Sequence, residues 1–406
     1  MKTLDVYLHR DLAGHLIQDE HGDMVFDYAP VWLESAEVRP LSRSLPLRTE
    51  RFSRKECRGF FGGILPEEGK RKLIAKNLGI SVQNDFAMLE CIGGECAGAI
   101  TFMPAGRPLP DEDGEYRVLS ESEFSDILDQ LPQKPLMAGE EGIRLSLAGA
   151  QDKLAVRVSG DEISLPLGSA PSTHILKPAI ERYKEVVFNE LLCMRLASQI
   201  GLPVAKAGEH HIRDKHYLLV ERYDRVMDNG RLSRLHQEDF CQSMAIPSSM
   251  KYQNEGGPSL KNCFDLLREA SSVPVLDLQN LLGGVIFNYL IGNHDAHGKN
   301  FSLLYHADGS VRLAPLYDLI STVYYPELSP KMAMKIGGEY RSERVIPRNF
   351  EKLAEEAGLA KPMVLGRVRD MAANIPAALE EIDMYFDSFD ALKTLIQKRC
   401  KNAVGD

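Results

Sequence analysis

The segment Ile291-Gly-Asn-His-Asp-Ala-His-Gly-Lys-Asn300 is the most informative stretch of the chain, because two histidines, an aspartate, a lysine and two asparagines follow an apolar run. Apolar side chains upstream recur at helical spacing and predict a buried helix that ends here; they are Leu282, Val285, Ile286, Tyr289 and Leu290. Polar groups beside a core are costly unless they have partners or a chemical role. We therefore expect a functional turn at the end of a core helix.

Asp295 and Asn300 stand five positions apart. A kinase catalytic loop, D-x-x-x-x-N, has the same spacing and presents an aspartate to the substrate hydroxyl and an asparagine oxygen to Mg²⁺. Asp318 follows eighteen residues after Asn300 and is a candidate second oxygen ligand, and two hard oxygens suit Mg²⁺. Each match alone is weak: the spacing is common by chance, and Asp318 is equally suited to cap a helix.

A different functional interpretation groups His294, Asp295, His297 and Asp318 as a metal-hydrolase cluster, since neutral imidazoles suit transition metals. It predicts zinc or iron in the protein and no requirement for ATP.

Ser146-Leu-Ala-Gly-Ala-Gln-Asp-Lys153 is a run of small residues that enters a predicted strand. Backbone amides in such a loop can approach phosphates without obstruction by side chains. The alternative is an ordinary tight turn, and the chain has no Walker loop, because the candidate at Gly63–Lys70 has the wrong spacing. The expected nucleotide-binding residues of the loop are Ala148, Gly149, Ala150, Gln151 and Lys153.

Lys177 ends a predicted strand, and Glu190 follows thirteen positions later in a predicted helix. A lysine and a helical glutamate in this order can form the ion pair that fixes a phosphate-binding lysine. A surface lysine and a solvated glutamate are the alternative.

Leu218-Leu-Val-Glu-Arg-Tyr-Asp-Arg225 reads as a strand that connects two lobes. Glu221 and Tyr223 are candidates for backbone contacts with an adenine, and Asp224 for a ribose hydroxyl, although Asp224 could instead pair with Arg222 or Arg225. The small-residue loop, lysine, helical glutamate, connector, D-x-x-x-x-N segment and metal aspartate follow one another in the order of a protein kinase. This order favours ATP and Mg²⁺ as cofactors more than any single motif does.

The N-terminal region predicts a separate strand-rich domain, with a hairpin over the alternating Met24, Phe26 and Tyr28. Between Arg39 and Lys76 eleven basic residues face four acidic ones, which suits either a solvated face or a docking face for an acidic partner or nucleic acid. Prolines at 104, 108 and 110, with an acidic turn at Asp111–Glu115, predict a linker. We expect an α+β protein with a β-rich domain at 1–105, a nucleotide-binding lobe at 106–224 and a mostly helical lobe at 225–406.

Composition excludes several classes of protein. At 406 residues the chain is too long for one small module, and its 44% hydrophobic content is too high for wholesale disorder. A net charge of −10 argues against nucleic-acid binding by bulk electrostatics. Seven scattered cysteines without a C-x-x-C pair suggest neither a disulfide framework nor structural zinc. With no apolar leader or membrane-length apolar run, we expect a cytoplasmic protein that does not contact membranes.

The chain resembles the HipA family of serine/threonine-protein kinase toxins. The resemblance rests on Ser146–Lys153, Thr173-His-Ile-Leu-Lys177, Glu221-Arg-Tyr-Asp224, His236-Gln-Glu-Asp239, Lys251-Tyr252 with Gly256-Gly-Pro258, Asn293–Asn300 and Leu316-Tyr-Asp318. Phe26–Leu33 and Pro40–Leu47 are similar to the additional N-terminal domain of that family.

The resemblance implies a bilobal protein-kinase-like fold in which Asp295 is the catalytic base, Asn300 and Asp318 hold Mg²⁺, and Lys177 holds phosphate. Glu221 and Tyr223 would form the hinge, Ser146 would be autophosphorylated, and His297 and Lys299 join the expected nucleotide-binding set. The implied partners are a HipB-type DNA-binding antitoxin and a protein target such as an aminoacyl-tRNA synthetase. The resemblance implies contact with DNA mainly indirectly, through the antitoxin. The rival class is a catalytically silent, kinase-shaped co-repressor of a DNA-binding protein.

Overall fold

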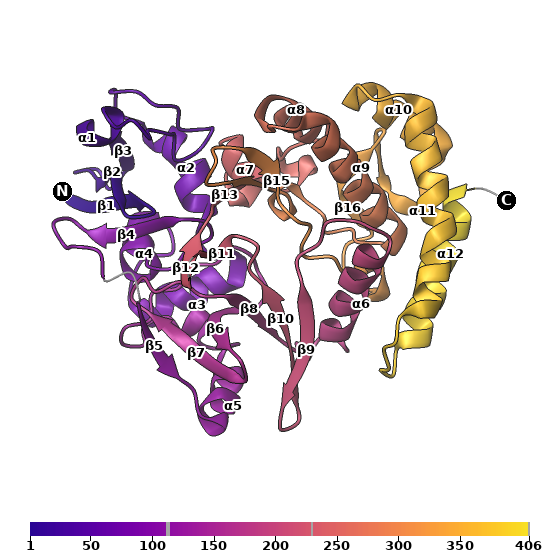
Figure 1. The fold of residues 1–406 in the computed structure, drawn as a ribbon, viewed down its shortest axis with the longest axis horizontal. Helices are drawn as coiled ribbons and strands as arrows, with labels where there is room; N and C mark the ends of the chain where they lie inside the picture. The colour runs from indigo at the N-terminus through magenta and orange to yellow at the C-terminus, as the bar shows by residue number, and fades with distance from the viewer. Residues whose placement is uncertain (111–113, 229, 405–406) are drawn as a thin grey trace. The chain divides into compact units, whose positions relative to one another are not determined.

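The computed structural model describes residues 1–110, 114–228 and 230–404 (Figure 1). The described chain forms two compact units, and each unit is assembled from separate stretches of sequence. Unit 1 comprises 1–178, 210–249 and 304–307, and unit 2 comprises 179–209, 250–303 and 308–406. Residues 111–113 of the expected acidic turn lie outside the described residues.

Unit 1 begins with an antiparallel sheet in the strand order β3-β2-β1-β4. Its strands are β1 (Lys2–Leu8), β2 (Asp11–Gln18), β3 (Met24–Tyr28) and β4 (Ile100–Pro104). The expected hairpin is β2 with β3, and it requires Gly14, because a Cβ there would lie 2.3 Å from the carbonyl oxygen of Asp27. Helices follow β3 along the chain: α1 (Pro30–Leu33), α2 (Arg54–Gly63), α3 (Glu68–Leu78) and α4 (Asp85–Ile92).

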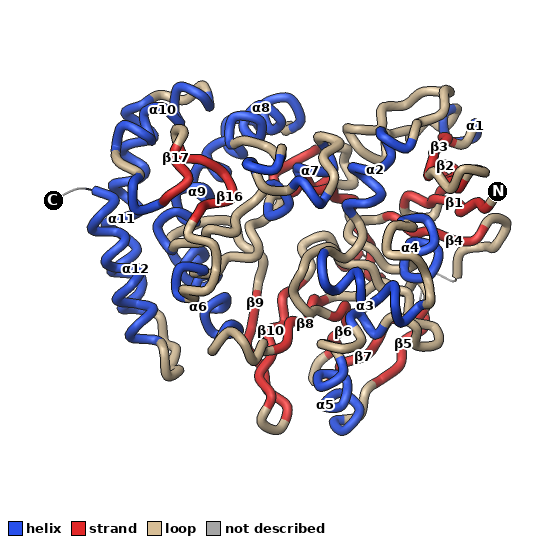
Figure 2. Tube along the Cα trace, turned by 180° about the vertical axis from the view of Figure 1, so that it is seen from behind, coloured by secondary structure: helices blue, strands red, loops and turns tan. Residues whose placement is uncertain are grey.

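A second sheet has the strand order β5-β7-β6-β8-β10-β9 (Figure 2, red). The strands are β5 (Glu115–Val118), β6 (Leu154–Ser159), β7 (Glu162–Leu167), β8 (His174–Pro178), β9 (Ala207–Ile212) and β10 (Lys215–Glu221), of which β9 enters unit 1 at His210. The three expected strands of this region are β6, β8 and β10. The remaining elements of this stretch are α5 (Glu121–Gln130) and the 3-10 turn Pro135–Met137.

Unit 1 continues past the connector with short elements. They are β11 (Arg225–Asp228), β12 (Arg231–Arg234), β13 (His236–Asp239) and α7 (Phe240–Ser243). Glu238 in β13 accepts from the Ser42 hydroxyl at 2.5 Å and from the Arg43 amide at 3.1 Å. These bonds give the Pro40–Leu47 segment a structural role, because the serine hydroxyl and a backbone amide satisfy a buried carboxylate.

Unit 2 is mostly helical. Its helices are α6 (Val186–Gln199), α8 (Leu260–Ala270), α9 (Pro274–Ile291), α10 (Pro347–Ala357), α11 (Lys361–Glu381) and α12 (Phe389–Val404). Its strands are β15 (Val311–Leu313), β16 (Lys331–Ile336) and β17 (Glu339–Arg341), while β14 (Ser302–Tyr305) runs from unit 2 into unit 1. The helix predicted from apolar periodicity is α9. Helix α11 packs beside α12 (Figure 1).

Helix α9 positions the polar segment that follows it. All its side chains from Leu281 to Ile291 are buried, so the helix is fixed in the core. It ends at Gly292, which has a left-handed φ of +77° and would bring a Cβ to 2.3 Å from a Val323 methyl group. Only glycine fits both demands, and the chain turns sharply into the Asn293–Asn300 segment.

Some of the eleven basic residues between Arg39 and Lys76 pair with acids of unit 1. Five of these side chains form ion pairs: Arg48 with Glu56, Arg51 with Asp27, Arg54 with Asp23, Lys70 with Asp152, and Arg71 with Asp85. This pairing reduces the local positive field and favours the interpretation as a solvated face. Among the described residues, no helix is long and apolar enough to cross a membrane.

Candidate active site

The polar segment after α9 presents Asp295 at the surface of unit 2. Its side chain is exposed, and its backbone N–H donates to Asn293 Oδ1 at 3.1 Å. One carboxylate oxygen, Oδ1, accepts from the phenol of Tyr252 at 2.7 Å. An exposed carboxylate that is oriented by one hydrogen bond, on a residue whose backbone is also held, can accept a proton from an incoming hydroxyl group.

Asn300 and Asp318, the two expected metal ligands, lie against each other. The Asn300 Nδ2 donates to Asp318 Oδ2 at 3.0 Å, and Asn300 Oδ1 accepts from the His297 N–H at 3.0 Å. Asp318 has a φ of +78°, a strained conformation for a residue with a side chain. Strain of this kind persists only where the surroundings enforce it, so the orientation of Asp318 is built into the fold.

The donor set of this pair suits a hard divalent cation. A carboxylate and an amide oxygen are the ligand types that Mg²⁺ takes from proteins. Asn300 and Asp318 would hold such a cation through these oxygens. The fit to a hard cation rests on the chemistry of these two oxygen-bearing side chains, which lie within hydrogen-bonding distance of each other.

The transition-metal interpretation is not supported by unit 2. The His294 ring is used within the fold, with Nε2 2.8 Å from the Ser342 hydroxyl and Nδ1 3.3 Å from the Ser329 carbonyl oxygen. Burial, with the nearby positive charge of Arg399, lowers the pKa of His294 to about 4, so the ring is neutral at physiological pH. Within 1–110, 114–228 and 230–404, no group of three or more His, Cys, Asp or Glu could hold a metal ion.

Asn293 was not assigned a role from the sequence, yet its side chain joins the segments of Asp295 and Asp318. Its Oδ1 accepts from the Asp295 N–H, and its Nδ2 lies 3.2 Å from the Asp318 carbonyl oxygen and 2.9 Å from Asn288 Oδ1. The side-chain amide of Asn293 therefore connects the backbones of Asp295 and Asp318. The available signal was an asparagine directly after the glycine that ends a buried helix.

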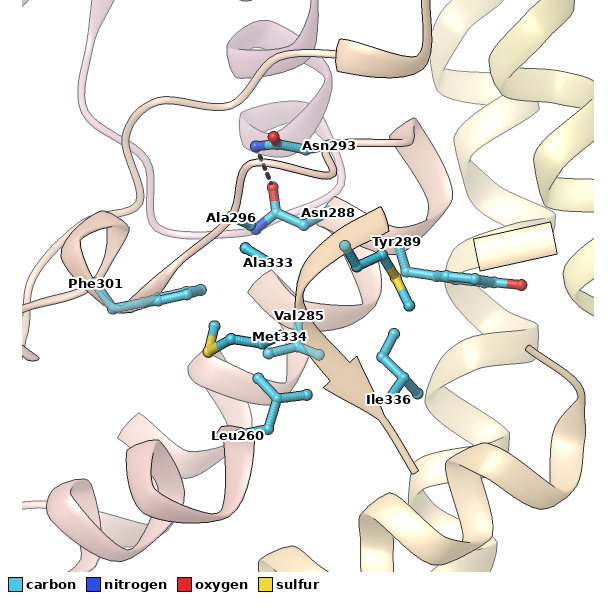
Figure 3. A pocket seen from close by; sticks show the side chains of 11 residues that line it. Leu260, Val285, Asn288, Tyr289, Asn293, Ala296, Phe301, Ala333, Met334 and Ile336 are labelled. Atoms are coloured by element: carbon cyan, nitrogen blue, oxygen red, sulfur yellow. Dashed lines mark hydrogen bonds between the residues drawn. The ribbon is translucent and has the colours of Figure 1, made fainter. Parts of the chain in front are cut away.

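An apolar pocket lies behind the polar segment (Figure 3). The Asn293–Asn288 hydrogen bond closes one end of it, and Phe301, Met334 and Leu260 project into it below. Ala333 of β16 also lines it, and the Ala333 N–H donates to the His294 carbonyl oxygen at 2.8 Å. This backing fixes the segment from the core side and leaves its chemistry on the outer side.

His297 and Lys299, two expected nucleotide-binding residues, are buried in the same segment. The His297 ring stands edge-on to the Tyr252 ring, with centroids 5.4 Å apart. The Lys299 carbonyl oxygen accepts from the Tyr317 hydroxyl at 2.8 Å, which ties the segment to the residue before Asp318.

In unit 1 the small-residue loop precedes β6, as expected. Gly149 has a φ of +110°, and a Cβ there would lie 2.5 Å from Lys153 Nζ, so a side chain would disturb the loop. Lys153 Nζ donates to the Ala148 carbonyl oxygen at 2.7 Å and closes the loop on itself. Ala150 and Gln151 are half-buried within it.

Ser146 is fully buried at the start of this loop. Its hydroxyl donates to the Ile64 carbonyl oxygen at 3.1 Å, and its backbone N–H donates to the Glu95 carbonyl oxygen at 2.9 Å. A phosphoryl acceptor at this position has to leave these partners before it can react.

Lys177 lies near the end of β8, where it pairs in register with Leu218 of β10. It is buried, with 7% of its side chain exposed, and Glu190 on α6 is 2% exposed. Neither residue is therefore the solvated surface group of the alternative interpretation. They belong to different units, and their ion pair stays a prediction.

The connector places Glu221, Tyr223 and Asp224 in different surroundings. Glu221 is exposed at the end of β10, opposite His174, and the Tyr223 hydroxyl donates to Gln237 Oε1. Asp224 is 1% exposed and accepts from Arg222 at 2.8 Å and from the Gly98 N–H at 2.7 Å. Burial raises the pKa of Asp224, but attraction to Arg222 and Arg225 outweighs this effect and holds the pKa well below its usual range. The ion-pair alternative describes these contacts of Asp224, and its contact with a ribose hydroxyl stays a prediction.

Asp224 belongs to a buried ionic cluster that the sequence did not reveal. Glu95 lies at its centre, with its carboxylate 3.0 Å from Arg222 and 2.7 Å from Arg225, and it also pairs with Arg234. The Glu95 side chain is completely buried, and the cluster joins the segment after α4 to the connector.

Comparisons with known proteins extend over nearly the whole chain. Residues 4–103 match the model of the HipA N-terminal domain, and residues 145–379 match that of the HipA-like C-terminal domain. The chain is 45% identical to the Sinorhizobium fredii protein Y4mE over 96% of this chain and 94% of that protein. It is 30% identical to the serine/threonine-protein kinase toxin HipA of Shewanella oneidensis over 99% of this chain and 96% of the relative.

A solved structure agrees with these matches. The structure of the Shewanella oneidensis toxin–antitoxin complex of HipA, HipB and operator DNA contains a chain with a TM-score of 0.87 and 29% identity, covering 99% of this chain and 97% of that one. This likeness confirms the predicted α+β, protein-kinase-like fold. The chain therefore belongs to the HipA family of serine/threonine-protein kinase toxins.

Proposed function

We propose that this kinase transfers the γ-phosphoryl group of ATP to a serine or threonine hydroxyl of a protein target, with Asp295 as the catalytic base. The observation that carries the proposal is the arrangement in unit 2. An exposed Asp295 is held by Tyr252 and Asn293, and the same Asn293 side chain reaches the backbone of Asp318, which contacts Asn300. Base and metal-ligand candidates share one rigid support.

In this proposal Asn300 and Asp318 hold Mg²⁺, which when bound neutralises charge on the transferring phosphoryl group. Lys177 contacts phosphate from β8, and the loop of Ala148, Gly149, Ala150, Gln151 and Lys153 offers its backbone. Glu221 and Tyr223 form the hinge and contact the adenine through their backbone groups. His297 and Lys299 complete the set of nucleotide-binding residues. The division into domains at 1–105, 106–224 and 225–406 remains part of the same proposal.

Autophosphorylation at Ser146 is proposed as the off switch. The hydroxyl of Ser146 is buried and bonded to Ile64, so the loop has to leave its place before Ser146 can accept phosphate. A phosphate adds roughly −1.5 to −2 charges. A doubly charged group cannot return to that buried position without a partner, and it would repel a nucleotide from the loop.

The proposed partner is a HipB-type DNA-binding antitoxin, which restrains the toxin and brings it to DNA. The Shewanella HipA chain was solved together with HipB and operator DNA, and this chain matches nearly all of that relative. The protein target is proposed as an aminoacyl-tRNA synthetase. A catalytically silent co-repressor is the alternative, which the presence of Asp295, Asn300 and Asp318 disfavours.

Replacing the base tests the proposal. Asp295→Asn keeps the size of the side chain and removes its negative charge, so phosphoryl transfer should fall by about 10²- to 10⁴-fold. ATP affinity should stay unchanged, because Asp295 acts on the acceptor hydroxyl. The measurement is incorporation of radiolabel from γ-³²P-ATP with Mg²⁺, beside equilibrium ATP binding. A wild-type chain that binds the antitoxin and never turns over ATP would support the co-repressor instead.

A further inference from the structure

The function proposed above assigns no part in the reaction to the Lys251-Tyr252 and Gly256-Gly-Pro258 motif, although Tyr252 contacts the proposed base. We propose that Tyr252 is a positioning residue that orients the Asp295 carboxylate for proton acceptance. Its phenol donates to Asp295 Oδ1 at 2.7 Å. An ionised carboxylate has acceptor capacity for further donors, so this bond orients the group without blocking it. The inference rests on the role proposed for Asp295.

Asp295 needs such a partner because its side chain is exposed. An exposed aspartate exchanges rotamers freely, and each rotamer aims the carboxylate elsewhere. The hydrogen bond from the Asp295 N–H to Asn293 Oδ1 fixes the backbone of Asp295, and the bond from the Tyr252 hydroxyl fixes the direction of its carboxylate. Misplacement of a reacting group by about 1 Å can cost about 10²-fold in rate.

The Tyr252 ring is itself held on two sides. The Lys251 ammonium lies 5.3 Å from the ring centroid, and Lys251 is 5% exposed. The His297 ring meets the Tyr252 ring edge-on, at 75° and 5.4 Å. A cation near an aromatic ring and an edge-on ring pair each add attraction beyond simple burial. The phenol therefore reaches Asp295 from a constrained position.

The glycines of the motif fold the backbone that carries Tyr252. The Tyr252 carbonyl oxygen accepts from the N–H groups of Glu255 and Gly257, each at 2.9 Å. Gly256 has a φ of +99°, and a Cβ on Gly257 would lie 2.4 Å from the Met250 carbonyl oxygen. These two positions require glycine. The closed turn explains why the motif couples a lysine–tyrosine pair to two glycines.

The turn is also anchored to the core of unit 2. Gln253 Oε1 accepts from the Lys335 N–H of β16 at 2.8 Å. The Ala333 N–H of the same strand donates to the His294 carbonyl oxygen at 2.8 Å. One strand therefore holds both the turn that carries Tyr252 and the segment that carries Asp295, which keeps the two side chains at a fixed separation.

The opposite role for the same contact is inhibition, with the phenol imitating an acceptor hydroxyl and excluding the true one. The two roles predict opposite signs. If Tyr252 positions the base, its removal slows transfer; if it competes with the acceptor, its removal speeds transfer.

Tyr252→Phe in the full-length chain tests the proposal, because it removes the hydroxyl and retains the ring contacts with Lys251 and His297. We expect the maximal rate of ³²P incorporation from γ-³²P-ATP and Mg²⁺ to fall by about tenfold, with the apparent KM for ATP unchanged. The matched control is Tyr385→Phe, because the Tyr385 side chain is 95% exposed, and it should keep the wild-type rate.

A double-mutant cycle separates positioning from a general structural effect. If Tyr252 acts through Asp295, Tyr252→Phe should change the residual rate of Asp295→Asn by less than about twofold. An equal loss in both backgrounds, a wild-type rate in Tyr252→Phe, or a faster rate would each overturn the inference while leaving the role of Asp295 intact. Absence of transfer by the wild-type chain would overturn the proposed function and this inference together.

Discussion

Glu95→Gln should destabilise unit 1 strongly, because Glu95 is the centre of the buried ionic cluster. Its side chain is completely buried, and Oε1 alone accepts from Arg222 at 3.0 Å, Arg225 at 2.7 Å and the Ser172 hydroxyl at 2.8 Å. Arg234 pairs with the second oxygen. Glutamine has the same size, but its amide group would point hydrogens at arginine hydrogens.

The magnitude follows from the charges left behind. Glu95 and Asp224 carry two negative charges beside the three positive charges of the arginines. The substitution therefore raises the formal charge of the buried cluster from +1 to +2. Breaking a buried pair from one side costs about 3 to 5 kcal/mol. The control is Glu90→Gln. Glu90 pairs with Lys2 at 3.0 Å, and the side chains of Glu90 and Lys2 are 32% and 63% exposed. An exposed pair of this kind contributes about 0 to 1 kcal/mol.

Urea unfolding followed by tryptophan fluorescence is the assay. The chain has one tryptophan, Trp32, which is 4% exposed in unit 1 and therefore reports the unfolding of that unit. We expect a lower midpoint for Glu95→Gln at an unchanged slope, with a loss in the free energy of unfolding several times that of Glu90→Gln. Equal losses in the two variants would refute the assignment of the cluster as a central support of unit 1.

The same cluster predicts acid sensitivity. Burial raises the pKa of Glu95, but attraction to Arg225, Arg234 and Arg222 outweighs it and lowers the pKa to about 2. A carboxyl with a lowered pKa in the folded state stabilises the fold above its unfolded value of about 4.3 and loses that contribution as the pH falls toward its folded value. Wild-type unit 1 should therefore lose stability below about pH 4.3, and Glu95→Gln should lack this part of the loss.

Two further predictions concern the site. Asn293→Ala removes the amide that holds the segments of Asp295 and Asp318, so the rate of radiolabel transfer should fall by about 10²-fold, and a wild-type rate would contradict the shared support. Chain phosphorylated at Ser146, with the site mapped by mass spectrometry, should bind ATP more weakly in calorimetry and be cut faster by protease in the 146–153 loop, whereas equal affinity would argue against the proposed switch.

Local periodicity and short spacings accounted for what the sequence predicted. The apolar stripe of α9 and the strands β6, β8 and β10 were predicted, since each signal lies within one element. The approach of Asn300 to Asp318 was predicted from a separation of eighteen residues, and the strands β14 and β15 lie between them in the chain. Over such distances, chain connectivity limits the alternatives.

Side-chain partners chosen over long separations were not predictable in the same way. Tyr252 meets Asp295 across 43 positions, and Arg222 meets Glu95 across 127. Neither hydrophobic periodicity nor residue spacing predicts such a pair, because the pair depends on how the folded helices and strands pack against one another. Asp224 shows both cases. Its pairing with the neighbouring Arg222 and Arg225 was among the alternatives that the sequence offered, whereas the contact of those arginines with Glu95 was not predicted.

The buried cluster bears on why the N-terminal region accompanies the kinase region. Glu95 lies within the span that matches the HipA N-terminal domain, and Arg222, Arg225 and Arg234 lie within the span that matches the C-terminal domain. Without Glu95, Arg234 would lose its ion pair, while Arg222 and Arg225 would still pair with Asp224. A loss of about 3 to 5 kcal/mol is a large share of an ordinary domain stability of about 5 to 15 kcal/mol. The connector residues Glu221 and Tyr223 flank Arg222 directly, so the geometry proposed to receive the adenine depends on a carboxylate from the N-terminal span. Glu95 and the three arginines therefore belong to one compact unit, and a chain that begins at residue 145 should lose its connector geometry before it loses the Asn293–Asn300 segment.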